Sequence, residues 1–145
     1  MTRQGVLDTI AAILAAVTTP TAQIVLRAEP LSIPSGERLA AFWYLGDATL
    51  HESLGDVQVD ELFVIQWYWR IQSVADVRQT LELEVWNANR NTQAGLRADS
   101  QLGGHATDLK IDEATTGYTT VGDAAFRVLK IPIHVWVYES EPISP

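Results

Sequence analysis

Three histidines and several carboxylates are the side chains of this sequence best suited to metal or acid–base chemistry. His51, His105 and His134 lie far apart, and none has a second ligand at the helical or short-loop spacing of zinc sites. His51-Glu52 with Asp56 offers ligand-type side chains, but carboxylates beside a histidine are common in acidic loops. The chain has no cysteine, so thiolate metal sites, thiolate catalysis and disulfides are excluded. We therefore expect no metal site and no cofactor.

Signatures of nucleophilic or nucleotide chemistry are also missing from the sequence. There is no Gly-x-Ser-x-Gly elbow, and no glycine precedes a Lys-Ser or Lys-Thr pair as in a phosphate-binding loop. Asp60-Glu61 and Asp112-Glu113 could supply an acid and a base, but adjacent side chains on a strand or loop point different ways. We predict a protein that is not an enzyme, with no catalytic residue. A site assembled from distant residues is the weaker alternative.

Length and charge limit the classes of protein to which this chain can belong. A chain of 145 residues fits one domain, and 47% hydrophobic with 19% charged residues is the composition of a folded protein. The net charge of −8 opposes binding to nucleic-acid phosphates or to anionic lipid. The apolar segment 6–17 is too short to span a bilayer and lacks the charge arrangement of a signal peptide. We expect a soluble protein with no membrane partner and no tightly bound nucleic acid.

Hydrophobic periodicity predicts two helices separated and followed by strands. The first helix covers 6–17, and the second begins at a capping sequence, Ser73 to Asp76, and continues through about 88, or as far as 98. This order predicts an α+β fold: a single domain, 1–145, with a mainly antiparallel sheet and two helices packed on one face. The predicted strands are 23–28, 39–45, 61–71, 108–112 and 126–139, with a turn at 102–104 and a loop at 115–117.

The last predicted strand has two different faces. The first is a core face, formed by Arg127, Leu129, Ile131, Ile133, Val135 and Val137. The second carries Lys130, His134, Trp136 and Tyr138, which could meet solvent, a helix or another protein. Pro132 withholds a backbone donor, which favours a sheet edge or a bulge over a strand paired on both sides.

The segment between Arg38 and Arg70 contains acidic residues and no Lys or Arg. We interpret its middle part, 47–60, as a solvated acidic loop that joins two strands. The alternative is a surface that faces passing DNA without binding it, or a basic partner. Its acidic residues are Asp47, Glu52, Asp56, Asp60 and Glu61.

The turn Leu102-Gly103-Gly104, the short strand 108–112 and the long alternating strand 125–139 together resemble the tail terminator and tail-completion proteins of long-tailed bacteriophages. The helix that contains Ile10-Ala-Ala-Ile-Leu-Ala-Ala-Val17 and the strand 61–71 lie where that family has its helix and central strand. The resemblance covers nearly the whole chain in element order.

The resemblance implies a structural virion protein. Such a subunit forms a ring, commonly a hexamer, at the head-proximal end of the tail tube, where it stops tube polymerisation and joins the tail to the head connector. Its partners would be further copies of itself, the tail tube protein and the connector or neck protein, with DNA only passing through the lumen. Assembly would take place in the host cytoplasm.

On this reading, candidate subunit or partner contacts lie on the second face of the last strand and in two predicted loops, 47–60 and 112–123. The candidates are Lys130, His134, Trp136, Tyr138, Asp47, Glu52, Asp56, Asp112, Glu113 and Asp123. A neck or head-completion protein and a tail tube subunit are the nearest alternatives. A small-ligand binding module and an enzyme are the more distant ones.

Overall fold

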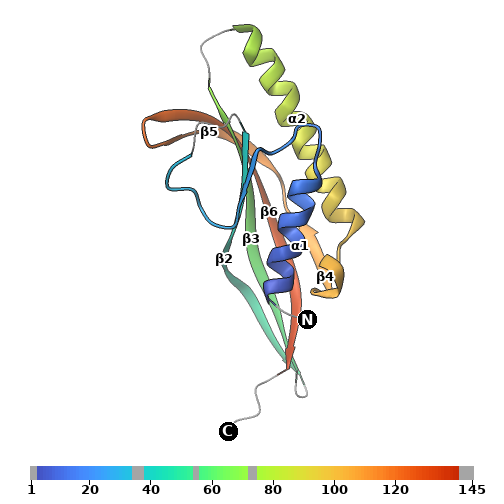
Figure 1. Ribbon diagram of the computed structural model, residues 1–145. Coiled ribbons are helices and arrows are strands. Elements are labelled where there is room, and N and C mark those ends of the chain that lie inside the picture. Colours follow the sequence, from blue (N-terminus) through green and yellow to red (C-terminus); the bar gives the residue numbers. More distant parts are fainter. Residues whose placement is uncertain (1–2, 34–37, 54–55, 72–74, 141–145) are drawn as a thin grey trace.

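A computed structural model describes residues 3–33, 38–53, 56–71 and 75–140 (Figure 1). It confirms the predicted α+β class, because two helices cover one face of a six-stranded, mostly antiparallel sheet. No helix in these ranges is long and apolar enough to cross a bilayer. The elements are α1 (Arg3–Ala16), β1 (Ile24–Leu26), β2 (Arg38–Ser53), β3 (Asp56–Arg70), α2 (Ala75–Ala98), a 3₁₀ turn η1 (Leu102–Gly104), β4 (Asp108–Ile111), β5 (Thr115–Val121) and β6 (Ala124–Ser140).

The central pair of the sheet is β3 with β6. These strands run antiparallel along almost their whole length, from Asp56 opposite Ser140 to Arg70 opposite Phe126. β2 pairs with the other edge of β3, and the short β1 adds to β2 in parallel. β5 and β4 follow one another along the far edge of β6. The prediction that 61–71 forms a central strand is confirmed.

The position of β6 differs from the edge position that Pro132 suggested. β6 pairs with β3 on one side and with β4 and β5 on the other. Pro132 is tolerated because β5 ends its pairing at Lys130 and β4 begins its pairing at Ile133. The Pro132 carbonyl accepts a hydrogen bond from the Asp112 amide at 2.9 Å, so the proline ring nitrogen faces the break between the two strands.

The two loops predicted at 47–60 and 115–117 are strands. Residues 47–53 and 56–60 belong to the long antiparallel strands β2 and β3, where Asp60 is 5% exposed and Glu61 fully buried. Residues 115–117 begin β5, which forms a hairpin with the start of β6. Both predictions were wrong for the same reason. Acidic or threonine-rich composition is typical of a solvated loop, but cross-strand pairing can satisfy the backbone hydrogen bonds of either segment.

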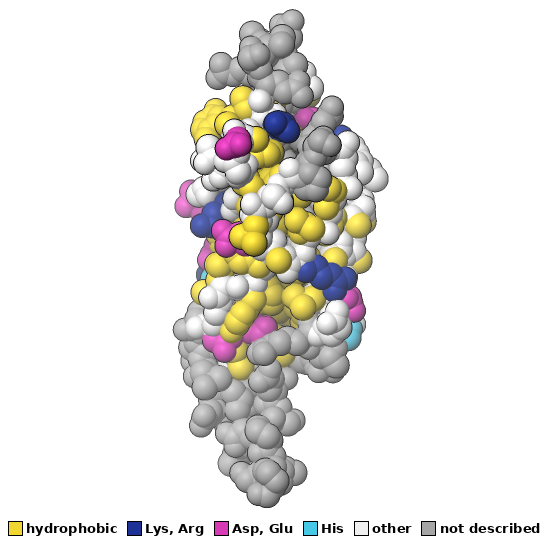
Figure 2. Space-filling model, turned by 60° about the vertical axis from the view of Figure 1, so that its left-hand side comes forward, with side chains coloured by type: hydrophobic (Ala, Val, Ile, Leu, Met, Phe, Trp, Pro, Cys, Tyr) yellow, Lys and Arg dark blue, Asp and Glu magenta, His cyan; other side chains and the backbone are white. Residues whose placement is uncertain are grey.

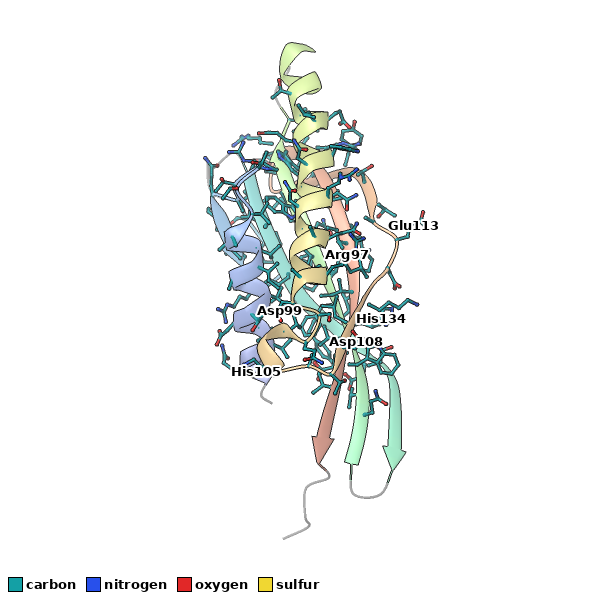
Figure 3. All side chains as sticks on the ribbon, turned by 90° about the vertical axis from the view of Figure 1, so that its right-hand side faces the viewer. Arg97, Asp99, His105, Asp108, Glu113 and His134 are labelled. Carbon is teal, nitrogen blue, oxygen red and sulfur yellow. The ribbon has the colours of Figure 1, made fainter. Side chains whose placement is uncertain are left out.

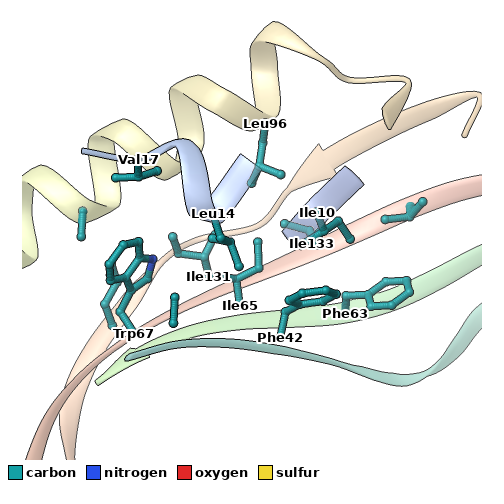
Figure 4. Packing of buried hydrophobic residues seen from close by; sticks show 14 of the residues in the cluster. Ile10, Leu14, Val17, Phe42, Phe63, Ile65, Trp67, Leu96, Ile131 and Ile133 are labelled. Atoms are coloured by element: carbon teal, nitrogen blue, oxygen red, sulfur yellow. The ribbon is translucent and has the colours of Figure 1, made fainter. Parts of the chain in front are cut away.

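The main core lies between the helices and the sheet. α1 contributes Val6, Ile10 and Leu14, all fully buried, at the spacing of one helical face. The odd-numbered residues of β6, from Leu129 to Val137, join them, which confirms the predicted core face. Figure 4 shows Ile10 and Leu14 above Phe42, Phe63, Ile65 and Trp67 of the sheet.

α2 is fixed across the sheet by polar contacts as well as by packing. Arg38 of β2 pairs with Glu84 at 2.7 Å, and Arg127 of β6 pairs with Glu82 at 2.9 Å. Its asparagines do not end the helix, which continues to Ala98 because Thr92 and Leu96 are buried against the core. The predicted cap at Ser73 lies outside the described residues.

Close approach of the two helices depends on Gly95. A Cβ atom at this position would lie 2.9 Å from Cγ2 of Ile13 on α1, closer than real Cβ contacts. One turn away, the buried Trp67 Nε1 donates a hydrogen bond to Thr92 Oγ1 at 3.1 Å. This bond lets a tryptophan fill the core between β3 and α2 without leaving its indole N–H unpaired.

Replacement of Thr92 by Val should lower the free energy of unfolding by about 1–3 kcal/mol, because the shape is kept but the Trp67 N–H loses its acceptor. Thr92→Ser is the matched control, since it keeps the hydroxyl and removes only a methyl group. Urea denaturation of both variants measures the difference. A Val variant as stable as the unmodified chain would show that the hydrogen bond contributes nothing.

Candidate interface on the helix-free face of the sheet

The sheet face opposite the helices is covered by protein at one end only. There, Leu39, Tyr68, Phe126 and Val128 form a second apolar cluster, against which Ile33 packs. Burial raises the pKa of Tyr68 to about 12, with a smaller contribution from the Glu29 charge, so its phenol stays neutral at ordinary pH. The rest of this face consists of the side chains that alternate with the core residues of β2, β3 and β6.

Three elements bring charged side chains together on the uncovered part of this face. His134 of β6 places Nδ1 2.9 Å from the Asp60 carboxylate of β3, and Nε2 2.7 Å from Oδ2 of Asp112, just after β4. Both ring nitrogens donate only when the imidazole is doubly protonated. The cluster therefore has the geometry of an imidazolium held between two carboxylates.

The electrostatics of His134 result from opposing effects. Burial on the sheet favours the neutral ring and would lower its pKa. The hydrogen bonds to Asp60 and Asp112, together with their negative charges, outweigh burial, so the pKa of His134 is raised above its ordinary value. The positive ring in turn compensates Asp60, which would otherwise be a buried carboxylate without a counter-charge beside it.

The arrangement suits a cross-strand contact better than a metal site. The two carboxylates bind opposite nitrogens of one ring, so their oxygens do not converge on a common point. Over the described ranges, no group of three His, Asp or Glu side chains is arranged to hold a metal ion. The cluster links β3, β6 and the connection after β4 to one another on the sheet face that does not carry the helices.

The predicted contact residues are not all in one place. His134 and Asp112 meet in the cluster, Lys130 is exposed, and Trp136 is half-buried on the same face. Glu113 and Asp123 are exposed, and Figure 3 shows Glu113 apart from His134 on the outer side of the chain after β4. Asp47 is exposed on β2, at the far side of the sheet. The side chains of Tyr138, Glu52 and Asp56 lie outside the described part of the chain.

Sequence reasoning missed other exposed apolar residues. Leu83 and Trp86 of α2 are 59% and 55% exposed, and Tyr44 and Leu45 of β2 are 46% and 54% exposed. Helical periodicity could have identified the first pair, because neither residue falls on the face that contains Leu81 and the other buried positions. The second pair carries no such signal, since it lies at a β-bulge that shifts the alternation.

Comparison with known proteins gives limited similarity. No protein-family model matches this chain, and no curated protein matches it in sequence. A solved chain from the virion of a native gene transfer agent particle is similar over 92% of this chain and 92% of its own length, with a TM-score of 0.48 and 13% identity. A chain from the sheath/tube terminator of an extracellular contractile injection system, in its extended state, is similar over 100% of this chain and 61% of its own length, with a TM-score of 0.44 and 15% identity. These likenesses assign the chain to no family.

The raised pKa of His134 predicts a specific dependence of stability on pH. Stabilisation from the charged ring is fully present below the unfolded-state pKa of about 6.5, and it is lost as pH rises through the higher folded-state value. The free energy of unfolding should therefore fall above pH 6.5 in the unmodified chain, by at most about 1.4 kcal/mol for each unit of pKa increase.

Urea unfolding from pH 6 to 9 measures this effect, with His134→Gln as the comparison because Gln does not titrate. His51 and His105 are present in both proteins, so the difference between the two curves isolates His134. Parallel curves over this range would contradict the charged cluster.

Proposed function

We propose that this chain is a structural subunit of a phage-tail-like particle. In finer detail, we propose that it forms a closed ring, commonly a hexamer in proteins of this kind, at the head-proximal end of a tail tube. There the ring would stop tube polymerisation and join the tail to the head connector or neck protein. The subunit would be built into the virion after assembly in the host cytoplasm.

The observation that carries this proposal is a thin sheet extension, which we call the arm. It consists of residues 51–53, 56–58 and 138–140, which pair with one another beyond Val137, the last β6 residue of the buried core. Figures 1 and 3 show these strands continuing past the ends of α1 and α2. This extension is a single sheet layer past the ends of the helices (Figure 1), and a single layer favours packing on another subunit, which can supply the second layer.

The charge of the hairpin that leads to the arm supports a role beside DNA. The sequence between Arg38 and Arg70 contributes five carboxylates and no Lys or Arg on adjacent antiparallel strands; Asp60 and Glu61 are buried, whereas Asp47 is exposed. A lumen lined by such hairpins would repel phosphate and let DNA pass without holding it. This supports a channel-forming subunit and opposes a DNA-binding one.

The helix-free face supplies the proposed contacts with neighbours. Lys130 and Trp136 lie on it beside the His134 cluster, and the two ends of the ring would meet the tube and the connector. A neck or head-completion protein is the nearest alternative, and it would bind the connector but not tube ends. A tail tube subunit would continue to polymerise.

The mass of the purified chain in solution tests the proposal. Light scattering on a sizing column at several concentrations, followed by negative-stain imaging, should give closed rings of about six subunits, because heterologous contacts that close have a fixed number. Long tubes would contradict the terminator function and indicate a tail tube protein instead. A chain that stays monomeric and does not bind tube ends would contradict the terminator function.

Substitution of Trp136 by Ala should weaken assembly more than it lowers the stability of the subunit. A half-buried tryptophan on an interface can contribute about 2 kcal/mol or more to association. Leu31→Ala is the control, because Leu31 is 93% exposed. Light scattering reports assembly and thermal unfolding reports stability. An unchanged oligomer with a lowered melting temperature would make Trp136 a core residue instead.

A further inference from the structure

The outward face of α2 combines apolar and basic side chains. Trp86 and Leu83 are more than half exposed, and the Arg90 guanidinium lies over the Trp86 ring, 4.7 Å from its centroid. Ala94 and Arg97 follow at the spacing that keeps them on the same side, opposite the residues that pack on the core. We call Leu83, Trp86, Arg90, Ala94 and Arg97 the α2 stripe.

The charge of this part of the helix is opposite to that of the whole chain. The segment 85–98 contains two arginines and no Asp or Glu, whereas the whole chain carries a net charge of −8. The helix surface is also hollowed around Arg90 and Arg97, between Asn89, Gln93 and Ala94. A cation stacked on an exposed indole presents apolar area and positive charge together, which suits a partner with exposed aromatic or aliphatic groups beside a carboxylate.

Such a surface exists on the same chain, on β2. Tyr44 and Leu45 are about half exposed, and Asp47 beside them is exposed and accepts a hydrogen bond from the Tyr44 hydroxyl at 2.5 Å. We call Tyr44, Leu45 and Asp47 the β2 patch. Figure 2 shows hydrophobic and acidic side chains near one another on the side of the molecule that includes β2.

The backbone at the β2 patch favours recognition through side chains. Among the described strands, β1 covers only residues 39–41 of this edge of β2. The edge beyond is interrupted by register shifts between Tyr44 and Gly46 and between Asp47 and Thr49, and Gly46 has a φ of +140°. Bulges of this kind twist an edge away from further strand pairing, so a helix face is a better occupant than an added strand.

We infer that the α2 stripe of one copy docks on the β2 patch of the next copy. The inference rests on the proposed function, and it identifies the subunit contact of the proposed ring. Trp86 would cover Tyr44 and Ala94 would lie on Leu45, while the arginines would face Asp47 and the acidic hairpin. Contact between two stripes or between two patches would bring like charges together, which opposes a two-fold dimer through either surface.

The positions of the two surfaces favour head-to-tail contacts between copies. α2 packs near β4 and β6 and meets the start of β2 through Glu84 and Arg38, whereas the β2 patch lies further along β2, on the other side of the central strands (Figure 1). Two different, mutually complementary surfaces on opposite sides generate head-to-tail contacts, which close into a ring or continue as a helix according to the rotation between subunits.

Disulfide cross-linking tests the contact directly, because the chain has no cysteine of its own. Leu45→Cys and Ala94→Cys are made as separate full-length proteins, one with a mass tag, then mixed and mildly oxidised. A disulfide between them requires Cα atoms within about 7 Å. We expect the 45–94 heterodimer to exceed, by about tenfold or more, the product of Leu31→Cys with Ala94→Cys, a contrast of about 1.4 kcal/mol or more.

Charge reversal provides the second measurement. Arg90→Glu with Arg97→Glu in the Ala94→Cys protein should reduce the 45–94 product about tenfold, because two favourable charge contacts become repulsive. Arg70→Glu, at an exposed arginine at the end of β3, is the matched control and should leave the yield within about twofold. Circular dichroism of each variant shows whether the fold is kept.

The outcomes separate this inference from the proposed function. Rings by light scattering without excess 45–94 disulfide would overturn the inference and leave the ring standing. Excess 45–94 disulfide in a protein that is monomeric at low concentration would support the contact and count against a stable ring without the tube. A monomer with no excess cross-link would overturn both.

Discussion

The long antiparallel pairing of β3 with β6 is the constraint on which the rest of the structure depends. Its register fixes which residues of both strands share a face, and a shift of β6 by one residue would move Ile131 and Ile133 away from the helices. The same register places Asp60 within reach of His134 on the opposite face. Core packing and the charged cluster are therefore set by one alignment of two strands.

The two faces of the β3–β6 pair are covered differently. On one face, α1 and α2 bury a continuous core, and α2 is held by ion pairs to strands on both sides of β3. On the other face, a polar cluster replaces a covering layer, because His134 can satisfy two carboxylates without any helix above it. Desolvation of Asp60 offsets part of the attraction within this cluster, so the cluster contributes less to net stability than its charges alone would give.

Periodicity in the sequence was sufficient for the elements whose buried residues recur regularly. The helix around Ile10 and the core face around Ile133 were predicted for this reason, and the order of elements gave the correct fold class. The hairpin at 47–60 was not predicted, although Asp56-Val-Gln-Val-Asp60 alternates polar and apolar residues, because acidic composition outweighed that short pattern. The His134 cluster joins residues 74 and 22 positions apart in the chain, and one sequence contains no information on the register that brings them together.

The distribution of charge explains how an acidic protein could still associate with itself. Net charge alone makes copies of this chain repel one another, and the excess of carboxylates is concentrated on the β2–β3 hairpin. The outward face of α2 is a local exception, with Arg90 and Arg97 and no carboxylate on that part of the helix. In the proposed head-to-tail contact, this helix face would meet the hairpin and offset part of the repulsion between whole subunits. The exposed apolar residues beside the charges would supply area to stabilise that contact.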